Sequence, residues 1–249
     1  MARAGFSDFL VIDIETVYDE RRWQPPVVPP TAERPMKSST SFGDGERPTG
    51  PLPFPPNWAQ RVIAIGYARL VDHRLVGCNV LVGSSVEADP DVRERTLLEQ
   101  FAELAGERAT LVTFNGRGFD LPVIALRSLC HGVPQPWYYR DRNVRARYSD
   151  DGHLDLCDWL ADHGATRSGS LDALTKLVGL PGKGAVDGSA VDGLYRAGDL
   201  AAIATYCAND VAQTALLFLR FRLMQGRISP EDYAVRNAEL VTALLPSGS

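Results

Sequence analysis

Cysteine is scarce in this sequence, and long apolar runs are absent. The four cysteines, Cys78, Cys130, Cys157 and Cys207, include no C-x-x-C pair. Their spacing indicates neither a zinc centre nor a disulfide framework, so each is expected to be a small buried side chain in a reducing cytosol. No apolar run approaches the roughly 20 residues that span a bilayer, and the N-terminus lacks the apolar region of a signal peptide. We therefore expect a soluble, cytoplasmic protein with no membrane partner.

Positive charge is also in short supply, since 26 Lys and Arg stand against 31 Asp and Glu, a formal net charge of -5. This balance argues against a protein that coats nucleic acid through its overall charge, but it leaves room for a local basic groove. The four histidines show no ligand spacing. A chain of 249 residues with 45% hydrophobic residues suits a single globular domain over 1–249.

Proline is concentrated in one segment. Ten of the 17 prolines fall between Pro25 and Pro56, mixed with Ser, Thr, Gly and charged residues. Such a segment cannot bury enough apolar surface to offset its ordering entropy, so an irregular insertion is expected at about 19–60. A functional flap and a poorly ordered insertion are the two interpretations that its composition allows.

The rest of the chain alternates strand and helix patterns. A hairpin turn at 71–73 joins the second and third strands, and the first three strands are predicted to form an antiparallel meander. The later alternation predicts a mixed sheet flanked by helices. Residues 155–160 begin a helix or a short strand, and the glycine-rich residues 179–193 are expected to form a loop. The expected strands are 9–15, 61–68, 74–82 and 111–114, and the expected helices are 92–105, 121–129, 171–178 and 199–224.

The first expected strand carries two carboxylates. Residues 9–15, Phe-Leu-Val-Ile-Asp-Ile-Glu, are mostly apolar and β-branched, which favours a central strand buried on both faces. Asp13 and Glu15 are two positions apart and therefore point to the same side. Neighbouring carboxylates in an apolar strand are tolerated when they are protonated, paired with a positive group, bound to a cation or exposed to solvent. A metal site and a solvated strand end are thus the alternatives.

A third acid follows a glycine-rich turn, Asn115-Gly116-Arg117-Gly118. Asp120 precedes Leu-Pro, a pattern typical of a helix N-terminus, so it is either a helix N-cap or part of a site. Asn115 either only forms the turn or brings its amide close to a substrate phosphate or base.

The last expected helix places a fourth acid inside an apolar face. Asp210 lies at the centre of this face, where a carboxylate is unfavourable without a partner. Tyr206, one turn earlier, shares the same edge, so the helix directs a phenol and a carboxylate to one place. The apolar face consists of Ile203, Cys207, Thr214, Leu217 and Phe221.

Four acids from three elements suit two divalent cations. Mg²⁺ and Mn²⁺ take oxygen ligands and keep several waters, so few carboxylates suffice. Two such ions about 3.5–4 Å apart activate water and stabilise the leaving oxygen in phosphoryl transfer.

In order and spacing, these residues resemble the three exonuclease motifs of the DEDD superfamily, in its tyrosine-containing branch. The chain is most similar to the predicted 3′–5′ exonucleases related to the exonuclease domain of family B DNA polymerases, from Phe9 to about Arg222. The resemblance implies an α/β, ribonuclease H-like fold whose sheet has three antiparallel strands followed by parallel ones. The matching motifs are Asp13-x-Glu15, Asn115 with Phe119-Asp120, Tyr206-x-x-x-Asp210, Arg147-Tyr148, His153-Leu154-Asp155-Leu156, Gly182-Lys183-Gly184 and Asp187-Gly188.

The resemblance also implies a role for each matching acid. Asp13, Glu15 and Asp210 would bind one Mg²⁺ or Mn²⁺ ion. Asp13 would bridge to a second ion, which Asp120 would hold directly or through water, and Tyr206 would orient the attacking water. The expected substrate contacts are Thr16, Asn115, Phe119 and Lys183.

The expected function is a two-metal 3′–5′ exonuclease that releases nucleoside monophosphates from the 3′ end of single-stranded DNA or RNA, alone or recruited by a polymerase or repair complex. One rival is a catalytically silent nucleic-acid-binding module of the same fold. Another is a carboxylate-pair glycosidase, whose activity would survive chelation of metals by EDTA and would need neither Asp120 nor Asp210. The basic, aromatic residues 137–148 either contact a nucleic-acid strand or form a solvated loop.

Overall fold

The computed structural model describes residues 7–24, 55–83, 89–106, 109–140, 142–180 and 190–245. Most of the proline-rich insertion lies outside these described residues, and so do Lys183 and the Gly182–Gly184 and Asp187–Gly188 blocks. None of the helices in the described part of the chain combines the length and apolarity needed to cross a bilayer.

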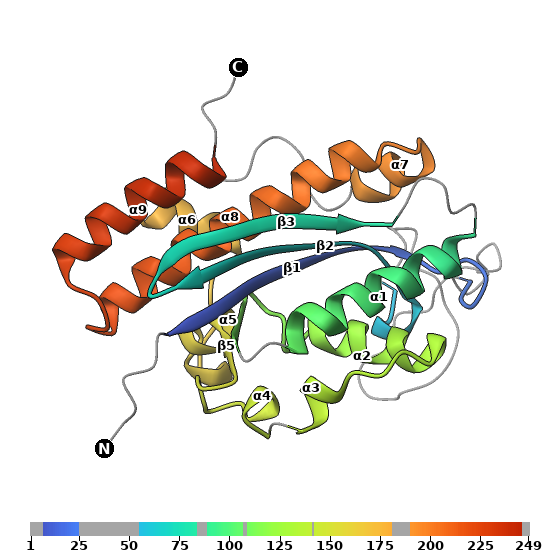
Figure 1. Cartoon of the computed structure of the whole chain (residues 1–249), viewed down its shortest axis with the longest axis horizontal. Helices are drawn as coiled ribbons and strands as arrows, with labels where there is room; N and C mark the ends of the chain where they lie inside the picture. Colours follow the sequence, from blue (N-terminus) through green and yellow to red (C-terminus); the bar gives the residue numbers. More distant parts are fainter. Residues whose placement is uncertain are drawn as a thin grey trace, which may run out of the picture.

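A five-stranded mixed sheet in the order β3-β2-β1-β4-β5 forms the centre of the molecule (Figure 1). Strand β1 pairs antiparallel with β2, and β2 pairs antiparallel with β3, which confirms the predicted meander. Strand β4 is parallel to β1, and β5 is parallel to β4. The α/β, ribonuclease H-like fold class is therefore confirmed. The strands are β1 (Asp8–Tyr18), β2 (Gln60–Val71), β3 (Arg74–Val82), β4 (Thr110–Thr113) and β5 (His153–Asp155).

Helices cover both faces of the sheet, and the apolar residues of β1 divide between them. Phe9 and Val11 pack in a core cluster with α8, while Leu10, Ile12 and Ile14 pack in a second cluster with α1 and α2. All five are 5% exposed or less, as expected for a central strand. The helices are α1 (Pro90–Gly106), α2 (Asp120–His131), α3 (Pro136–Arg140), α4 (Arg142–Arg145), α5 (Leu156–Leu160), α6 (Leu171–Leu177), α7 (Val191–Arg196), α8 (Leu200–Met224) and α9 (Pro230–Leu244), with 3-10 turns η1 (Asn57–Ala59) and η2 (Asp162–Gly164).

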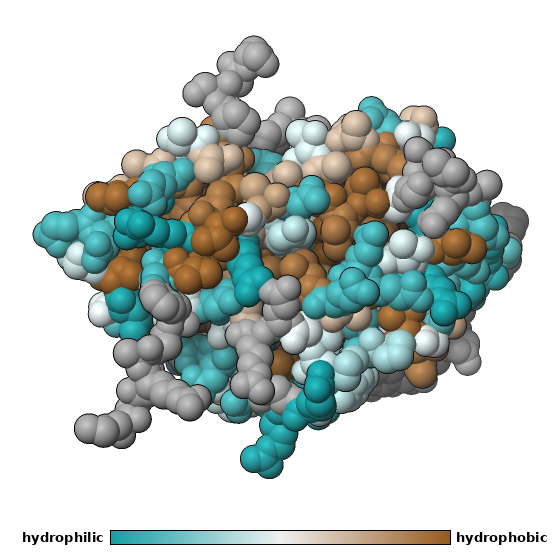
Figure 2. Space-filling model, viewed as in Figure 1, coloured by the Kyte–Doolittle hydropathy of each residue, from teal (hydrophilic) through white to brown (hydrophobic). Residues whose placement is uncertain are grey.

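Helix α8 is buried more completely than a one-sided apolar face predicts. Every residue from 210 to 219 is buried, because α9, which the sequence pattern did not predict, packs against it (Figure 1). Serine at position 229 caps α9, and Pro230 occupies its first turn. The outer strand β3 remains partly uncovered, and apolar side chains gather along it and the helices beside it (Figure 2).

Three predictions need correction. Helix α7 begins at Val191, inside the residues 179–193 that were expected to form a loop. Residues 137–148 form most of two short helices, α3 and α4, where a solvated loop was one alternative. Cys78 and Cys130 are exposed, and of the four cysteines only Cys207 is fully buried.

Candidate active site

The carboxylates of β1 lie on the face of the sheet that α8 covers. Oxygens of Asp13 and Glu15 and the Cys207 sulfur of α8 all lie within 4.8 Å of one another. The Cys207 thiol is 3.7 Å from the Asp13 carbonyl oxygen, to which it donates a hydrogen bond. Glu15 is 7% exposed, and Asp13 is partly buried, so only Asp13 of the two acids is in contact with solvent to any great extent.

Gly66 allows this close approach of helix to sheet. It is the β2 residue that pairs with Asp13. A Cβ atom at this position would come within 2.8 Å of both the Cys207 sulfur and a Val211 methyl carbon. The absence of a side chain therefore lets α8 lie directly over the paired strands beside Asp13.

Tyr206 and Asp210 of α8 flank Cys207 and are 8% and 5% exposed. Burial raises the pKa of the Cys207 thiol well above its ordinary value, and the charges of Asp13, Glu15 and Asp210 raise it further. The thiol thus stays protonated, and three carboxylates from two elements surround one position on α8. The apolar helix face predicted around Asp210 is buried, as expected.

Asp120 joins the group from the other side of β1. It is not the N-cap of α2, because Phe119 occupies that position and Asp120 is the first helical residue. Pairing between β1 and β4 ends at Val11, and the Asp120 carboxylate accepts a hydrogen bond from the Ile14 N–H beyond that point. Asp120 is 5% exposed. Burial first, and then the charge of Asp155, raises its pKa to about 7.

Asp155 fixes the turn that leads to Asp120. Its carboxylate oxygens accept hydrogen bonds of 2.8 Å from the backbone N–H groups of Asn115 and Arg117. It also caps helix α5 by accepting from the N–H of Cys157 at 3.0 Å. Asn115 has a φ of 64°, which the turn requires. Sequence reasoning did not assign Asp155 to the site, although its place between a strand and a helix in the His-Leu-Asp-Leu block was a usable signal.

Three of the expected substrate contacts, Thr16, Asn115 and Phe119, are within the described residues and lie close in sequence to Glu15 or Asp120. The pairing of β1 with β2 is interrupted by a bulge between Glu15 and Thr16. The Thr16 hydroxyl donates a hydrogen bond to Gln60 Oε1 at 3.0 Å. Asn115 is exposed at the turn, and Phe119 is partly buried against the core cluster beneath α1 and α2.

A buried ionic cluster, made of Asp19, Arg61, Glu94, Arg127 and His131, was not predicted. Arg127 of α2 donates to Glu94 of α1 at 2.7 Å and to Asp19 at 2.8 Å. Arg61 at the start of β2 donates to Asp19 at 2.9 Å. Asp19, Arg61, Glu94 and Arg127 are each 4% exposed or less. The cluster joins the end of β1 to α1 and α2, and it holds α2 two turns beyond Asp120.

The carboxylates of the candidate site are suitable ligands for a hard divalent cation. Oxygens of Asp13 and Glu15 lie together on β1, and Asp120, hydrogen-bonded to the Ile14 N–H between them, is a buried acid whose raised pKa shows that it would gain stability from a positive partner. Asp91, Glu94 and His131 form a second group whose side chains are close enough together to bind one metal ion. Its carboxylates already bind the guanidinium groups of Arg22, Arg61 and Arg127.

Solved structures with the same fold include two enzymes of DNA metabolism. The family B DNA polymerase of the hyperthermophilic archaeon Pyrobaculum calidifontis superimposes with a TM-score of 0.54 and 17% identity, over 87% of this chain and 24% of the polymerase. The zinc-bound E. coli exonuclease I–ssDNA complex superimposes with a TM-score of 0.51 and 14% identity, over 89% of this chain and 41% of exonuclease I. The chain therefore spans less than half of either protein, and the likeness defines its fold. No curated protein matches it.

The family is defined by residues 52–249, which match the model described as "Predicted 3'-5' exonuclease related to the exonuclease domain of PolB". The chain belongs to this family. The matched range includes Asp120, Tyr206 and Asp210, whereas Asp13 and Glu15 precede it.

Proposed function

We propose that this protein is a metal-dependent 3′–5′ exonuclease acting on single-stranded DNA or RNA and releasing nucleoside monophosphates. The observation that carries the proposal is the placement of four carboxylates around one stretch of β1. Asp13 and Glu15 lie on it beside Cys207, the charge of Asp210 acts on the same thiol, and Asp120 accepts a hydrogen bond from the Ile14 N–H. Three of the four are 7% exposed or less. Membership of an exonuclease family supports the reaction class. The fold shared with an exonuclease I crystallised with ssDNA supports a single-stranded substrate. We take residues 1–249 to act as one exonuclease domain.

The four carboxylates would hold two Mg²⁺ or Mn²⁺ ions. Asp13, Glu15 and Asp210 would bind one ion, and Asp13 and Asp120 would bind the other. When bound, the ions would activate water and stabilise the leaving oxygen of the phosphodiester.

The remaining residues of the site position the reactants. Tyr206, one helical turn before Asp210, orients the attacking water through its phenol group. Thr16 and Phe119 contact the terminal nucleotide, while Asn115 and Lys183 contact its phosphates or base. Asp155 keeps the 115–118 turn, and with it Asp120, in position.

A digestion panel tests this function. Single- and double-stranded DNA and RNA oligonucleotides with a 5′ label, and with free or blocked 3′ ends, are incubated with Mg²⁺, Mn²⁺ or EDTA. We expect stepwise shortening of single strands with free 3′ ends, only in the presence of metal. A wild-type protein that binds these strands but digests none at any metal concentration would instead be a silent binding module.

Tyr206 and its exposed neighbour on α8 provide a matched pair of variants. Replacing Tyr206 by Phe removes the water-orienting hydroxyl and should slow digestion on the order of 10²-fold. Replacing Thr205 by Ala removes an exposed hydroxyl that donates to the Ala201 carbonyl one turn earlier, and it should leave the rate unchanged. Equal rates for the two variants would remove Tyr206 from the mechanism.

A further inference from the structure

A basic, aromatic surface lies beside the candidate active site, on α3, α4 and the turn that follows them. We infer that this surface, formed by Tyr138, Tyr139, Arg140, Arg142 and Arg145, binds the body of the single strand whose 3′ end is hydrolysed. The inference rests on the proposed function and identifies where the rest of the substrate lies.

Charge distinguishes this surface from the rest of the molecule. Residues 137–148 carry four arginines and one aspartate, in a chain whose formal net charge is -5. Arg140, Arg142 and Arg145 are exposed, and no carboxylate among the described residues lies within salt-bridge distance of them. Guanidinium groups that have no carboxylate partner in the described part of the chain can bind phosphates strongly.

Exposed aromatic rings accompany these charges. Tyr139 is 58% exposed and Tyr148 is 75% exposed. The Arg145 guanidinium lies 5.5 Å from the centroid of the Tyr139 ring and 6.0 Å from that of Tyr138. Alternating rings and guanidinium groups are the features on which single-stranded bases stack while the phosphates are neutralised. A duplex, whose bases are already stacked, would not use the rings.

The chain just after this surface contacts the 115–118 turn that precedes Asp120. Arg117 in that turn and Arg147 after α4 both bind the Asp158 carboxylate, at 3.1 and 2.8 Å. The Arg145 guanidinium lies 6.0 Å from the Tyr138 ring, and the charge of Arg117 also acts on the Tyr138 phenol, so both guanidinium groups lie within electrostatic range of it. A strand with its 3′ end at Asp120 would therefore pass Arg117 and continue over Tyr138 and Arg145.

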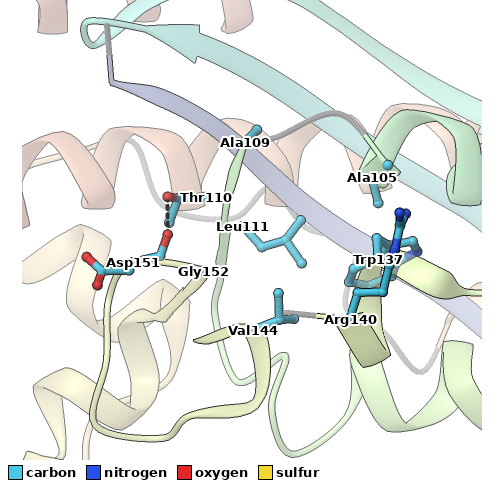
Figure 3. Close-up of a pocket in the computed structure, with 10 residues that line it drawn as sticks. Ala105, Ala109, Thr110, Leu111, Trp137, Arg140, Val144, Asp151 and Gly152 are labelled. Carbon is cyan, nitrogen blue, oxygen red and sulfur yellow. Dashed lines mark hydrogen bonds between the residues drawn. The ribbon is translucent and has the colours of Figure 1, made fainter. Parts of the chain in front are cut away.

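A hollow of about 540 Å³ continues the surface at the end of β4 farther from the site. Figure 3 shows Trp137 and Arg140 together on one side of it, with Leu111 and Val144 pointing into it from β4 and α4. The side formed by Trp137 and Arg140 suits a base together with its phosphate, whereas Asp151 on the opposite side would repel a phosphate there. Because Arg140 belongs to both, the hollow extends the same path away from the candidate active site.

Fluorescence anisotropy with a 5′-fluorescein 12-mer in EDTA tests the surface without turnover. The double variant Tyr139→Ala/Arg145→Ala should raise Kd about tenfold or more, from lost stacking. Its log Kd should also depend less steeply on log salt, by about 0.7 for each lost phosphate contact. Arg227→Ala, an exposed arginine after α8, removes the same charge elsewhere and should leave Kd unchanged. Unchanged affinity in the double variant, or equal wild-type affinity for a blunt duplex, would overturn the inference.

A small substrate separates this inference from the proposed function. The p-nitrophenyl ester of thymidine 5′-monophosphate is too short to reach α3 and α4. The double variant should hydrolyse this ester at the wild-type rate while its KM for the 12-mer rises. If the wild-type protein hydrolyses neither substrate, the proposed function fails, and the anisotropy comparison still decides the binding surface.

Discussion

Replacement of Arg127 by Met tests whether the buried ionic cluster holds α2 in place. Methionine fills a similar volume, but it leaves the Asp19 and Glu94 carboxylates without the guanidinium group that bridges them. Both carboxylates are 1% exposed or less, so water cannot replace the lost hydrogen bonds.

The expected destabilisation follows from what remains around the two acids. Removing one partner of a buried ion pair costs about 3–5 kcal/mol. Asp19 retains Arg22 and Arg61, and Glu94 retains the Val62 N–H and His131, which places the loss at the lower end of that range. A loss of about 3 kcal/mol corresponds to a decrease in Tm of roughly 6–12 °C for a domain of this size.

Thermal unfolding followed by circular dichroism measures this difference. Arg95→Met on α1 is the matched control, because Arg95 is exposed and pairs only with Glu99 four residues later. Exposed pairs of this kind contribute about 0.3–0.5 kcal/mol, so Tm should fall by only about 1–2 °C. Equal decreases in Tm for the two variants would refute the structural role of Arg127.

Three further predictions follow from other parts of the structure. Bonds from Arg22, Arg127 and Arg61 outweigh burial and lower the pKa of Asp19 to about 2, so its stabilisation is present above its ordinary pKa of 3.8. Urea unfolding should accordingly show a free energy that falls as pH drops from about 5 toward 2, and a constant value there would contradict the ion pairing. Gly66→Ala should destabilise the fold by about 1–3 kcal/mol, because the added methyl group would contact Cys207. Gly77→Ala on β3, where open space surrounds the glycine, should not change stability in this way. Equal Tm values for the two variants would contradict the close packing of α8 at Gly66. Asp155→Asn should lower kcat about 10–100-fold by releasing the 115–118 turn, and wild-type kcat in this variant would show that the turn needs no such support.

The main strands and long helices could be predicted because their patterns are local. Residues 9–15 carry enough apolar and β-branched side chains to specify a buried strand, and the 25 residues of α8 repeat the 3.6-residue period over about seven turns. By contrast, β5 has three residues, and its conformation depends on pairing with Leu111–Thr113 of β4. Helices α3, α4 and α7 have four to six residues each, so their stability comes from tertiary packing rather than from periodicity.

The acids of the candidate site were recognisable as side chains out of place in apolar elements, but their partners were not. The contact of Asp120 with the Ile14 N–H depends on β1–β4 pairing that ends at Val11, which no local pattern specifies. From the sequence of α2 alone, Arg127 would be expected on the surface. Only the packing of α1 and β1 around it makes it the centre of an ionic cluster.

The convergence of carboxylates on β1, α2 and α8 is tested most directly by Asp210→Asn, which keeps the shape of the side chain and removes its charge. The measurement is Mn²⁺-dependent digestion of a 5′-labelled single-stranded oligonucleotide, with unfolding curves to verify the fold. We expect a ladder of progressively shorter products from the wild-type protein in Mn²⁺ and intact substrate from the variant at every Mn²⁺ concentration. A full ladder from the variant, or from the wild-type protein in EDTA, would contradict the account.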